Sequence, residues 1–288
     1  MASAPSKAAF VLVHGAWHGA WTYERVIPLL ARCGHAAIAR DLPAHGLLAR
    51  LPASYHKRPF GLAAFATEAS PGAGTTLEDY ADHVLAAVDE ARGLGHEKVV
   101  LVGHSMGGVA ITAAAEQAPE KIAHLVYLTG FMPAPGVPLM SYIRSPENDG
   151  ELVGPSLVGN PEVTGCLRVD PLSSDLEYRA RLKEAFYGDV DDAQFATIAH
   201  LLTPDAPIGG FIEPVTATIE RWGALPRHYI MCLEDRALRP RLQQRFIDEV
   251  DAITPGNATR VHRIAASHSP FFSMPGQVAE LLSEIAAS

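Results

Sequence analysis

One five-residue segment has the residue types and spacing of a nucleophilic site: Gly103-His104-Ser105-Met106-Gly107. It follows an apolar run, 99–102, which predicts a buried strand, and it precedes residues 109–115, which can form a helix. A Gly-X-Ser-X-Gly pattern between a strand and a helix is typical of a nucleophile elbow. Both glycines are needed because a Cβ at either position would collide with neighbouring backbone. Ser105 is therefore the candidate nucleophile, with its hydroxyl held clear of the sheet.

A serine hydroxyl needs a base that accepts its proton and an acid that orients the base. Around such an elbow, the acid and then the histidine follow the serine in the chain. Of the 13 histidines, only His268 lies between the last predicted strand, 259–264, and the final helix. Asp235 follows the preceding strand, 227–233; Glu234 competes with it, because neighbouring side chains point to opposite sides. His268 must be neutral to accept a proton, so activity is expected to fall in acid.

The oxyanion of such a reaction needs two N–H donors near the serine. The candidates are the backbone N–H of Met106 and that of Ala16, in the glycine-rich loop after the first predicted strand. Candidates for binding substrate lie beside these segments or are large and apolar, although each apolar one is also consistent with ordinary core. They are Gly15, Trp17, His104, Phe131, Met132, Phe186 and Leu201, with Phe195 and Phe211 as further members. An uncharged, fairly apolar ester fits this set best.

The elements that must position these residues alternate between strands and helices. Strands are predicted at 8–13, 36–39, 99–102, 123–129, 227–233 and 259–264. This order predicts an α/β fold with a mainly parallel sheet of six strands or more and helices on both faces. Residues 131–222, rich in proline and glycine and without a convincing strand, are predicted as an inserted helical cap on a core of 1–130 and 223–288. Within that core, 47–74 is predicted as a long surface excursion that forms part of the entrance wall.

Local signals predict several helix boundaries. A capping box is expected at 75–78, and Ser273 is expected to cap the final helix. A helix over 22–33 should stop at Gly34, and short cap helices are expected at 176–187 and 192–202.

Composition excludes several classes of function. The chain has 288 residues, 48% of them apolar, and a formal net charge of −9 without any basic run. Nucleic acid and membrane surfaces are therefore poor partners. A small-molecule ester is the expected partner, and a homodimer is left open.

Three widely spaced cysteines argue against disulfides and a zinc site and predict buried thiols. No metal site is expected at His14 and His18, because they lie in a glycine-rich loop. The N-terminus lacks a signal-peptide pattern, so a cytoplasmic location is expected.

Longer motifs carry a resemblance to a known family. The segments 11–21 (VLVHGAWHGAW), 41–46 (DLPAHG), 103–108 (GHSMGG) and 267–275 (SHSPFFSMP), together with Asp235, resemble the methylesterase and hydroxynitrile lyase branch of the α/β-hydrolase superfamily. Residues 186–189 (FYGD) and the Ser-Met-Pro ending of 267–275 also resemble bacterial carboxylesterases of the pyrethroid-hydrolase type. The resemblance implies a Ser-His-Asp triad, an acyl-enzyme and no cofactor, and it supports Asp235 over Glu234. The match is good at both ends of the chain and loose in the cap.

The same branch implies an alternative chemistry. Lyase members carry a threonine where Gly15 stands and a lysine directly after the catalytic histidine, where this chain has Ser269. Both departures favour ester hydrolysis over C–C cleavage. Lactone hydrolysis would use the same residues, and a ligand-binding member without catalysis is the remaining alternative.

Overall fold

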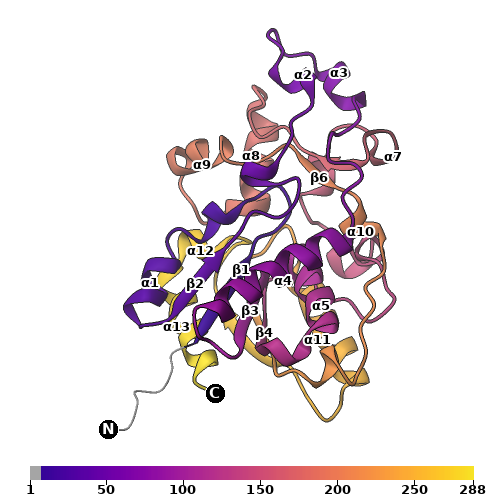
Figure 1. Cartoon of the computed structure of the whole chain (residues 1–288). Coiled ribbons are helices and arrows are strands. Elements are labelled where there is room, and N and C mark those ends of the chain that lie inside the picture. The colour runs from indigo at the N-terminus through magenta and orange to yellow at the C-terminus, as the bar shows by residue number, and fades with distance from the viewer. Residues whose placement is uncertain (1–7) are drawn as a thin grey trace.

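The centre of the protein is a six-stranded parallel sheet (Figure 1). The computed structural model describes residues 8–288. The strand order is β2-β1-β3-β4-β7-β8. The strands are β1 (Ala9–Val13), β2 (Ala36–Ala39), β3 (Val99–His104), β4 (Ile122–Leu128), β7 (Arg227–Cys232) and β8 (Arg260–Ile264). This confirms the α/β class and all six expected strands, whose ends lie within two residues of the expected ones.

The sheet is buried on both faces because its strands are continuously apolar. On β1, Phe10 and Leu12 point to one face and Val11 and Val13 to the other, as strand alternation requires. The first face packs against α1 (Ile27–Arg32) and α13 (Pro275–Ala286). The second face packs against α4 (Leu77–Gly93), α5 (Gly107–Gln117) and α11 (Pro240–Ile253). The parallel order brings the carboxyl ends of β1, β3, β4 and β7 to one edge, where the candidate site residues follow the strands.

Most of the chain between β4 and β7 lies beyond this carboxyl edge, on the side of α8 and α9 in Figure 1. Its helices are α6 (Leu139–Ile143), α7 (Pro161–Thr164), α8 (Leu176–Tyr187), α9 (Asp192–Ala199) and α10 (Gly209–Ile212). Short 3-10 helices are η4 (Pro146–Asn148), η5 (Gly154–Ser156) and η6 (Trp222–Ala224). The segment is mainly helical, as expected, while the boundaries 131 and 222 stay a prediction.

The expectation that this cap segment contains no strand is wrong. β5 (Cys166–Arg168) pairs antiparallel with β6 (Asp205–Pro207) in a separate two-stranded sheet. Each strand has three residues and β6 ends in proline, so neither is long enough to show an alternating pattern.

The excursion over 47–74 packs on the cap. It contains α2 (Ala53–His56) and α3 (Leu62–Thr67), which lie at the end of the molecule opposite both termini in Figure 1. The buried guanidinium of Arg168 pairs with Asp205 across β5 and β6, with Nε 2.6 Å from Oδ1. The same guanidinium donates to the carbonyl oxygens of Phe65 and Glu68. Arg168 therefore joins the excursion to the cap.

The remaining elements refine the local predictions. The helix expected over 22–33 is divided into η1 (Ala20–Tyr23) and α1, and Cys33 is exposed rather than buried. The capping box forms one residue later than expected, with Thr76 as N-cap and Asp79 as its reciprocal partner. Ser273 does not cap α13, because its hydroxyl donates to Asp189.

The other short helices are η2 (Gly46–Leu48), η3 (Pro119–Lys121) and α12 (Pro270–Ser273). Within residues 8–288, no helix combines the length and apolar character needed to cross a bilayer.

Candidate active site

Ser105 occupies a sharp turn between β3 and α5. Its φ of 51° lies in the left-handed region, which an L residue adopts only under strain. A Cβ on Gly103 would lie 2.6 Å from the carbonyl oxygen of Gly107, and a Cβ on Gly107 would lie 2.6 Å from that of His14. The Ser105 carbonyl accepts from the N–H groups of Gly108 and Phe131, at 2.9 Å each. These contacts hold the strained turn and explain why both glycine positions exclude a side chain.

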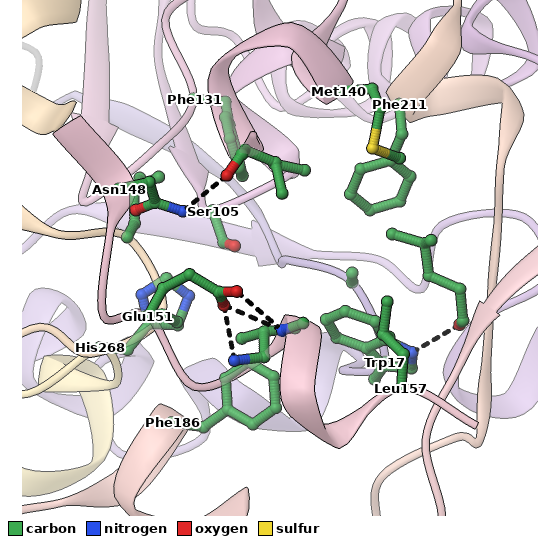
Figure 2. A pocket seen from close by; sticks show the side chains of 17 residues that line it. Trp17, Ser105, Phe131, Met140, Asn148, Glu151, Leu157, Phe186, Phe211 and His268 are labelled. Carbon is green, nitrogen blue, oxygen red and sulfur yellow. Dashed lines mark hydrogen bonds between the residues drawn. The ribbon is translucent and has the colours of Figure 1, made fainter. Parts of the chain in front are cut away.

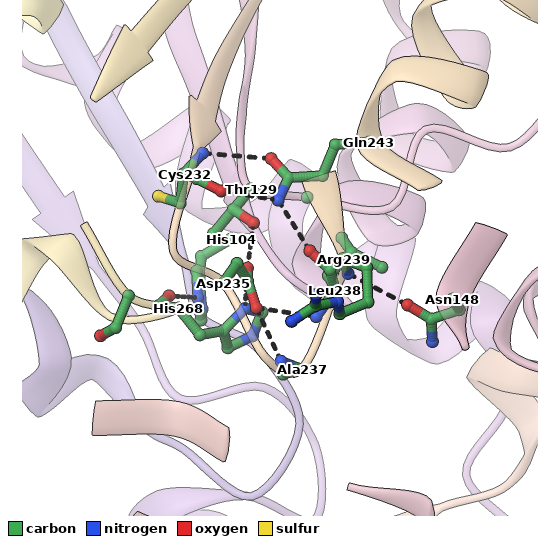
Figure 3. A network of polar contacts seen from close by, with 12 residues as sticks. His104, Thr129, Asn148, Cys232, Asp235, Ala237, Leu238, Arg239, Gln243 and His268 are labelled. Atoms are coloured by element: carbon green, nitrogen blue, oxygen red, sulfur yellow. Dashed lines mark hydrogen bonds and ion pairs between the residues drawn. The ribbon is translucent and has the colours of Figure 1, made fainter. Parts of the chain in front are cut away.

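His268 and Asp235 meet although 33 positions separate them (Figure 3). The Nδ1 of His268 lies 2.6 Å from Oδ2 of Asp235, and both side chains are buried. Because a carboxylate only accepts hydrogen bonds, Nδ1 is the donor in this pair, and in a neutral ring the lone pair is then on Nε2. Glu234, the competing acid, is exposed.

The Asp235 carboxylate accepts from four donors. Oδ1 takes the backbone N–H groups of Ala237 and Leu238, at 2.7 Å each. Oδ2 accepts from the Thr129 hydroxyl at 2.5 Å and from His268 Nδ1. Charge-assisted bonds of this kind fix the carboxylate in one orientation, so the His268 ring has one defined partner.

Gln243 on α11 anchors the loop that carries Asp235. Its side chain accepts from the N–H of Cys232 at 3.1 Å and donates to the carbonyl oxygens of Cys232 and Leu238, at 3.1 and 2.7 Å. These three bonds connect the end of β7 to the start of α11 on either side of Asp235 (Figure 3).

His104 contacts the loop that carries His268. Its Nε2 donates to the backbone carbonyl of His268 at 2.9 Å, and the two ring centroids lie 4.7 Å apart. Burial holds the pKa of His104 well below the usual histidine range, so the ring is neutral. A Cβ on Gly15 would lie 2.7 Å from the Ser105 Cβ and 2.9 Å from His104 Nδ1. Gly15 and His104 therefore shape the base of the site.

The candidate oxyanion donors lie on both sides of Ser105. Met106 directly follows Ser105, and Ala16 lies in the loop after β1 that packs against the same turn. Among residues 8–288, neither backbone N–H donates to another protein group. The next residue, Trp17, has a positive φ of 63°, and its ring N–H donates to the Leu167 carbonyl at 2.9 Å. The loop is thus held in shape by the cap.

Ser105 and His268 line one cavity under the cap (Figure 2). The empty space of the cavity and its open mouth is about 550 Å³, of which about 70 Å³ can hold the centre of a water molecule. The sheet core and its loops contribute Ala16, Trp17, Ser105, Phe131, Ala237, Leu238 and His268. The cap contributes Met140, Ile143, Asn148, Glu151, Val153, Gly154, Leu157, Leu167, Phe186 and Phe211. The lining is mostly apolar, with Asn148 and Glu151 as the polar side chains from the cap.

Other residues selected from the sequence lie elsewhere. Leu201 is about half exposed and lines a separate hollow with Leu47 and His200, because it follows the end of α9 and faces outward. Met132 is fully buried in the core and does not line the cavity, and Phe195 packs against Tyr187. Gly15, His104 and Met106 lie behind the lining rather than in it. The sequence placed these residues near the site, but side-chain direction depends on packing that a pattern does not contain.

Most of the cap lining was missed. Met140, Ile143, Asn148, Glu151, Leu157 and Leu167 lie in segments without a clear period, so no sequence signal separates them from their neighbours. Thr129 was missed as a partner of Asp235; the only available signal was its position directly after β4.

The two histidines of the β1 loop have protein partners. His14 Nε2 accepts from the Leu42 N–H at 2.9 Å. His18 Nδ1 donates to the Ala16 carbonyl at 2.6 Å, and its Nε2 accepts from the Tyr187 hydroxyl at 2.7 Å. Burial lowers the pKa of His18 to about 3, which leaves the ring neutral. His18 thus connects the loop after β1 to the end of α8.

Comparison with known proteins shows which family the chain resembles. A model of the alpha/beta hydrolase family matches residues 10–281. Polyneuridine aldehyde esterase of Rauvolfia serpentina is 30% identical over 301 residues, covering 100% of this chain and 98% of its own. Methylesterase 9 of Arabidopsis thaliana is 29% identical over 287 residues, covering 96% of this chain and 97% of its own. The crystal structure of a pyrethroid hydrolase from Sphingobium faniae JZ-2 matches with a TM-score of 0.74 and 25% identity, covering 98% of each chain.

The chain belongs to the alpha/beta hydrolase family. Its relatives and structural neighbours place it among hydrolases of the carboxylesterase type. The resemblance drawn from the sequence motifs, to methylesterases and to pyrethroid-hydrolase-type enzymes, is thereby confirmed.

Proposed function

We propose that this protein hydrolyses uncharged, fairly apolar carboxylic esters through Ser105, His268 and Asp235. The observation that carries the proposal is the buried His268–Asp235 pair, with 2.6 Å between Nδ1 and Oδ2, beside the cavity that the strained Ser105 also lines. A fixed proton on Nδ1 leaves Nε2 as the base for a serine hydroxyl.

The reaction has two halves. Ser105 Oγ attacks the ester carbonyl as its proton passes to His268 Nε2, and the backbone N–H groups of Ala16 and Met106 bind the oxyanion. Each such donor typically stabilises the transition state by about 3 kcal/mol. His268 then protonates the leaving alcohol and leaves an acyl group on Ser105. Water, deprotonated by His268, releases the carboxylate and restores the serine.

The cavity lining supports the substrate class. Its apolar side chains from both the sheet loops and the cap favour apolar acyl or alcohol groups. Trp17, Phe131, Phe186 and Phe211 provide aromatic surface. Relatives named as methylesterases act, by that name, on esters, and structural neighbours are named as pyrethroid hydrolases.

Ser105→Ala tests the nucleophile directly. Wild-type protein should hydrolyse a short p-nitrophenyl ester and should be labelled at Ser105 by a fluorophosphonate, detected by peptide mass spectrometry. Ser105→Ala should fold with an unchanged circular dichroism spectrum, lose the label and lose activity by several orders of magnitude. Ser283→Ala, on the outer part of α13, is the matched control and should behave as wild type. Activity retained by Ser105→Ala would remove the proposed mechanism.

The same assay separates the alternatives. A substrate panel with a lactone and a cyanohydrin distinguishes ester hydrolysis from lactone hydrolysis and C–C cleavage. The close approach at Gly15 favours hydrolysis, because the threonine that lyase members carry would displace Ser105 or His104. A binding protein without catalysis would leave the fluorophosphonate unreacted.

A further inference from the structure

Glu151 is the acidic side chain in the lining of the candidate active-site cavity. It comes from the cap, three residues before η5, and it faces the same cavity as Ser105 and His268 (Figure 2). Apart from His268, the other side chains that line the cavity have no titratable group. A carboxylate in such a lining places a negative charge where substrate and product would bind.

The Glu151 carboxylate is held by backbone groups. Oε2 accepts from the Val153 N–H at 2.6 Å and the Gly154 N–H at 2.9 Å, and Oε1 also accepts from Gly154 at 3.0 Å. Within residues 8–288, no charged nitrogen of a lysine, arginine or histidine side chain lies within 4.0 Å of its oxygens. Partial burial raises the pKa of Glu151, as expected for a carboxylate that lacks a cationic partner. The charge is therefore fixed in direction and is not neutralised by an ion pair.

We propose that Glu151 determines substrate charge: it excludes esters whose acyl part carries a carboxylate, and it repels the carboxylate product. This proposal rests on the proposed function of the same cavity. Like charges repel more strongly in a partly desolvated cavity than in water, because the effective dielectric constant is lower. A neutral ester does not experience this repulsion, whereas its hydrolysis converts it into an anion that does. One side chain thus selects neutral substrate and weakens product inhibition.

A matched pair of esters tests the charge selection. The p-nitrophenyl monoester of glutaric acid carries a carboxylate, and its methyl ester has the same chain without the charge. Wild-type protein should hydrolyse the neutral ester with a kcat/KM at least about tenfold higher. Glu151→Gln removes the charge and keeps an oxygen acceptor for the backbone N–H groups. The ratio of the two kcat/KM values should fall about tenfold in Glu151→Gln, and the inhibition constant of pentanoate should fall likewise.

Controls separate charge from structure. Glu177→Gln makes the same change in net charge at an exposed position on α8, and its ratio should equal that of the wild type. If Glu151→Gln lowers both kcat/KM values together and leaves the ratio unchanged, Glu151 only holds its turn and the proposal is wrong. A wild type that hydrolyses neither ester would instead refute the proposed function.

A measurement on the wild type alone covers the case in which Glu151→Gln fails to fold. Pentanoate and pentanamide have nearly the same shape and differ in charge. Pentanoate should inhibit hydrolysis of the neutral ester at least about tenfold more weakly than pentanamide. Equal inhibition by the two compounds would overturn the proposal.

Discussion

Replacing Asp235 with asparagine should reverse the proton arrangement of His268. Oδ1 of Asp235 faces two fixed backbone donors, the N–H groups of Ala237 and Leu238. An asparagine must place its oxygen there, because an NH₂ group would oppose two N–H groups. The NH₂ then faces His268 Nδ1, which must become an acceptor, so the ring proton moves to Nε2. His268 has then lost the Nε2 lone pair that the proposed mechanism requires for deprotonating Ser105.

The Asp235→Asn substitution should affect both the stability and the activity of the protein. The backbone bonds survive and the Thr129 hydroxyl can rotate to accept from the amide, so the variant should fold. Loss of the charge-assisted bonds should reduce the free energy of unfolding by about 1–3 kcal/mol. The wrong tautomer costs about 10⁴-fold in kcat in a serine protease with the same arrangement. We expect a fall of roughly 10³- to 10⁴-fold here, equivalent to about 4–5.5 kcal/mol in the activation free energy.

Two measurements check this reasoning. Hydrolysis of a neutral p-nitrophenyl ester gives kcat, and histidine side-chain ¹⁵N spectra, assigned with His268→Gln, report the tautomer. Glu234→Gln is the matched control, because it removes the neighbouring exposed carboxylate and should leave both measurements unchanged. The assignment of Asp235 would be refuted if the Asp235→Asn variant kept more than about a tenth of the wild-type activity. It would also be refuted if the His268 proton stayed on Nδ1.

Two further predictions concern stability. Burial lowers the pKa values of His14 and His104 well below the histidine range, and those of His18 and His45 to about 3 and about 4. Below about pH 6.5, these histidines therefore bind protons in the unfolded chain but not in the folded chain. Adding acid then favours the unfolded chain. Each such histidine lowers the free energy of unfolding by up to about 1.4 kcal/mol per pH unit. Urea unfolding midpoints should fall between pH 7 and pH 5; an unchanged midpoint would contradict this. Arg168→Met should reduce the free energy of unfolding by about 3–5 kcal/mol, because it leaves Asp205 buried without its partner. Thermal unfolding with Arg92→Met as an exposed control measures this, and equal midpoints for the two variants would disprove it.

The sequence by itself determined the sheet and the three catalytic candidates. The buried strands are continuous apolar runs. The Gly-X-Ser-X-Gly turn excludes side chains at Gly103 and Gly107, because a Cβ there would meet backbone a few residues away or at the end of the adjacent strand β1. Chain order then restricted the acid and the base to the loops after the last two strands. The sheet could be predicted because local pattern and strand order control it, and the same two features are what select the three candidates.

Only the tertiary structure decided the lining of the cavity and the support of the catalytic candidates. Glu151 and Leu167 face the cavity while Leu201 does not, although nothing in their local sequence separates them. The partners Thr129 and Gln243 are likewise visible only once β4, β7 and α11 are packed together. The cap has short helices and two three-residue strands without a period, so the direction of each side chain is set by contacts between segments far apart in the chain.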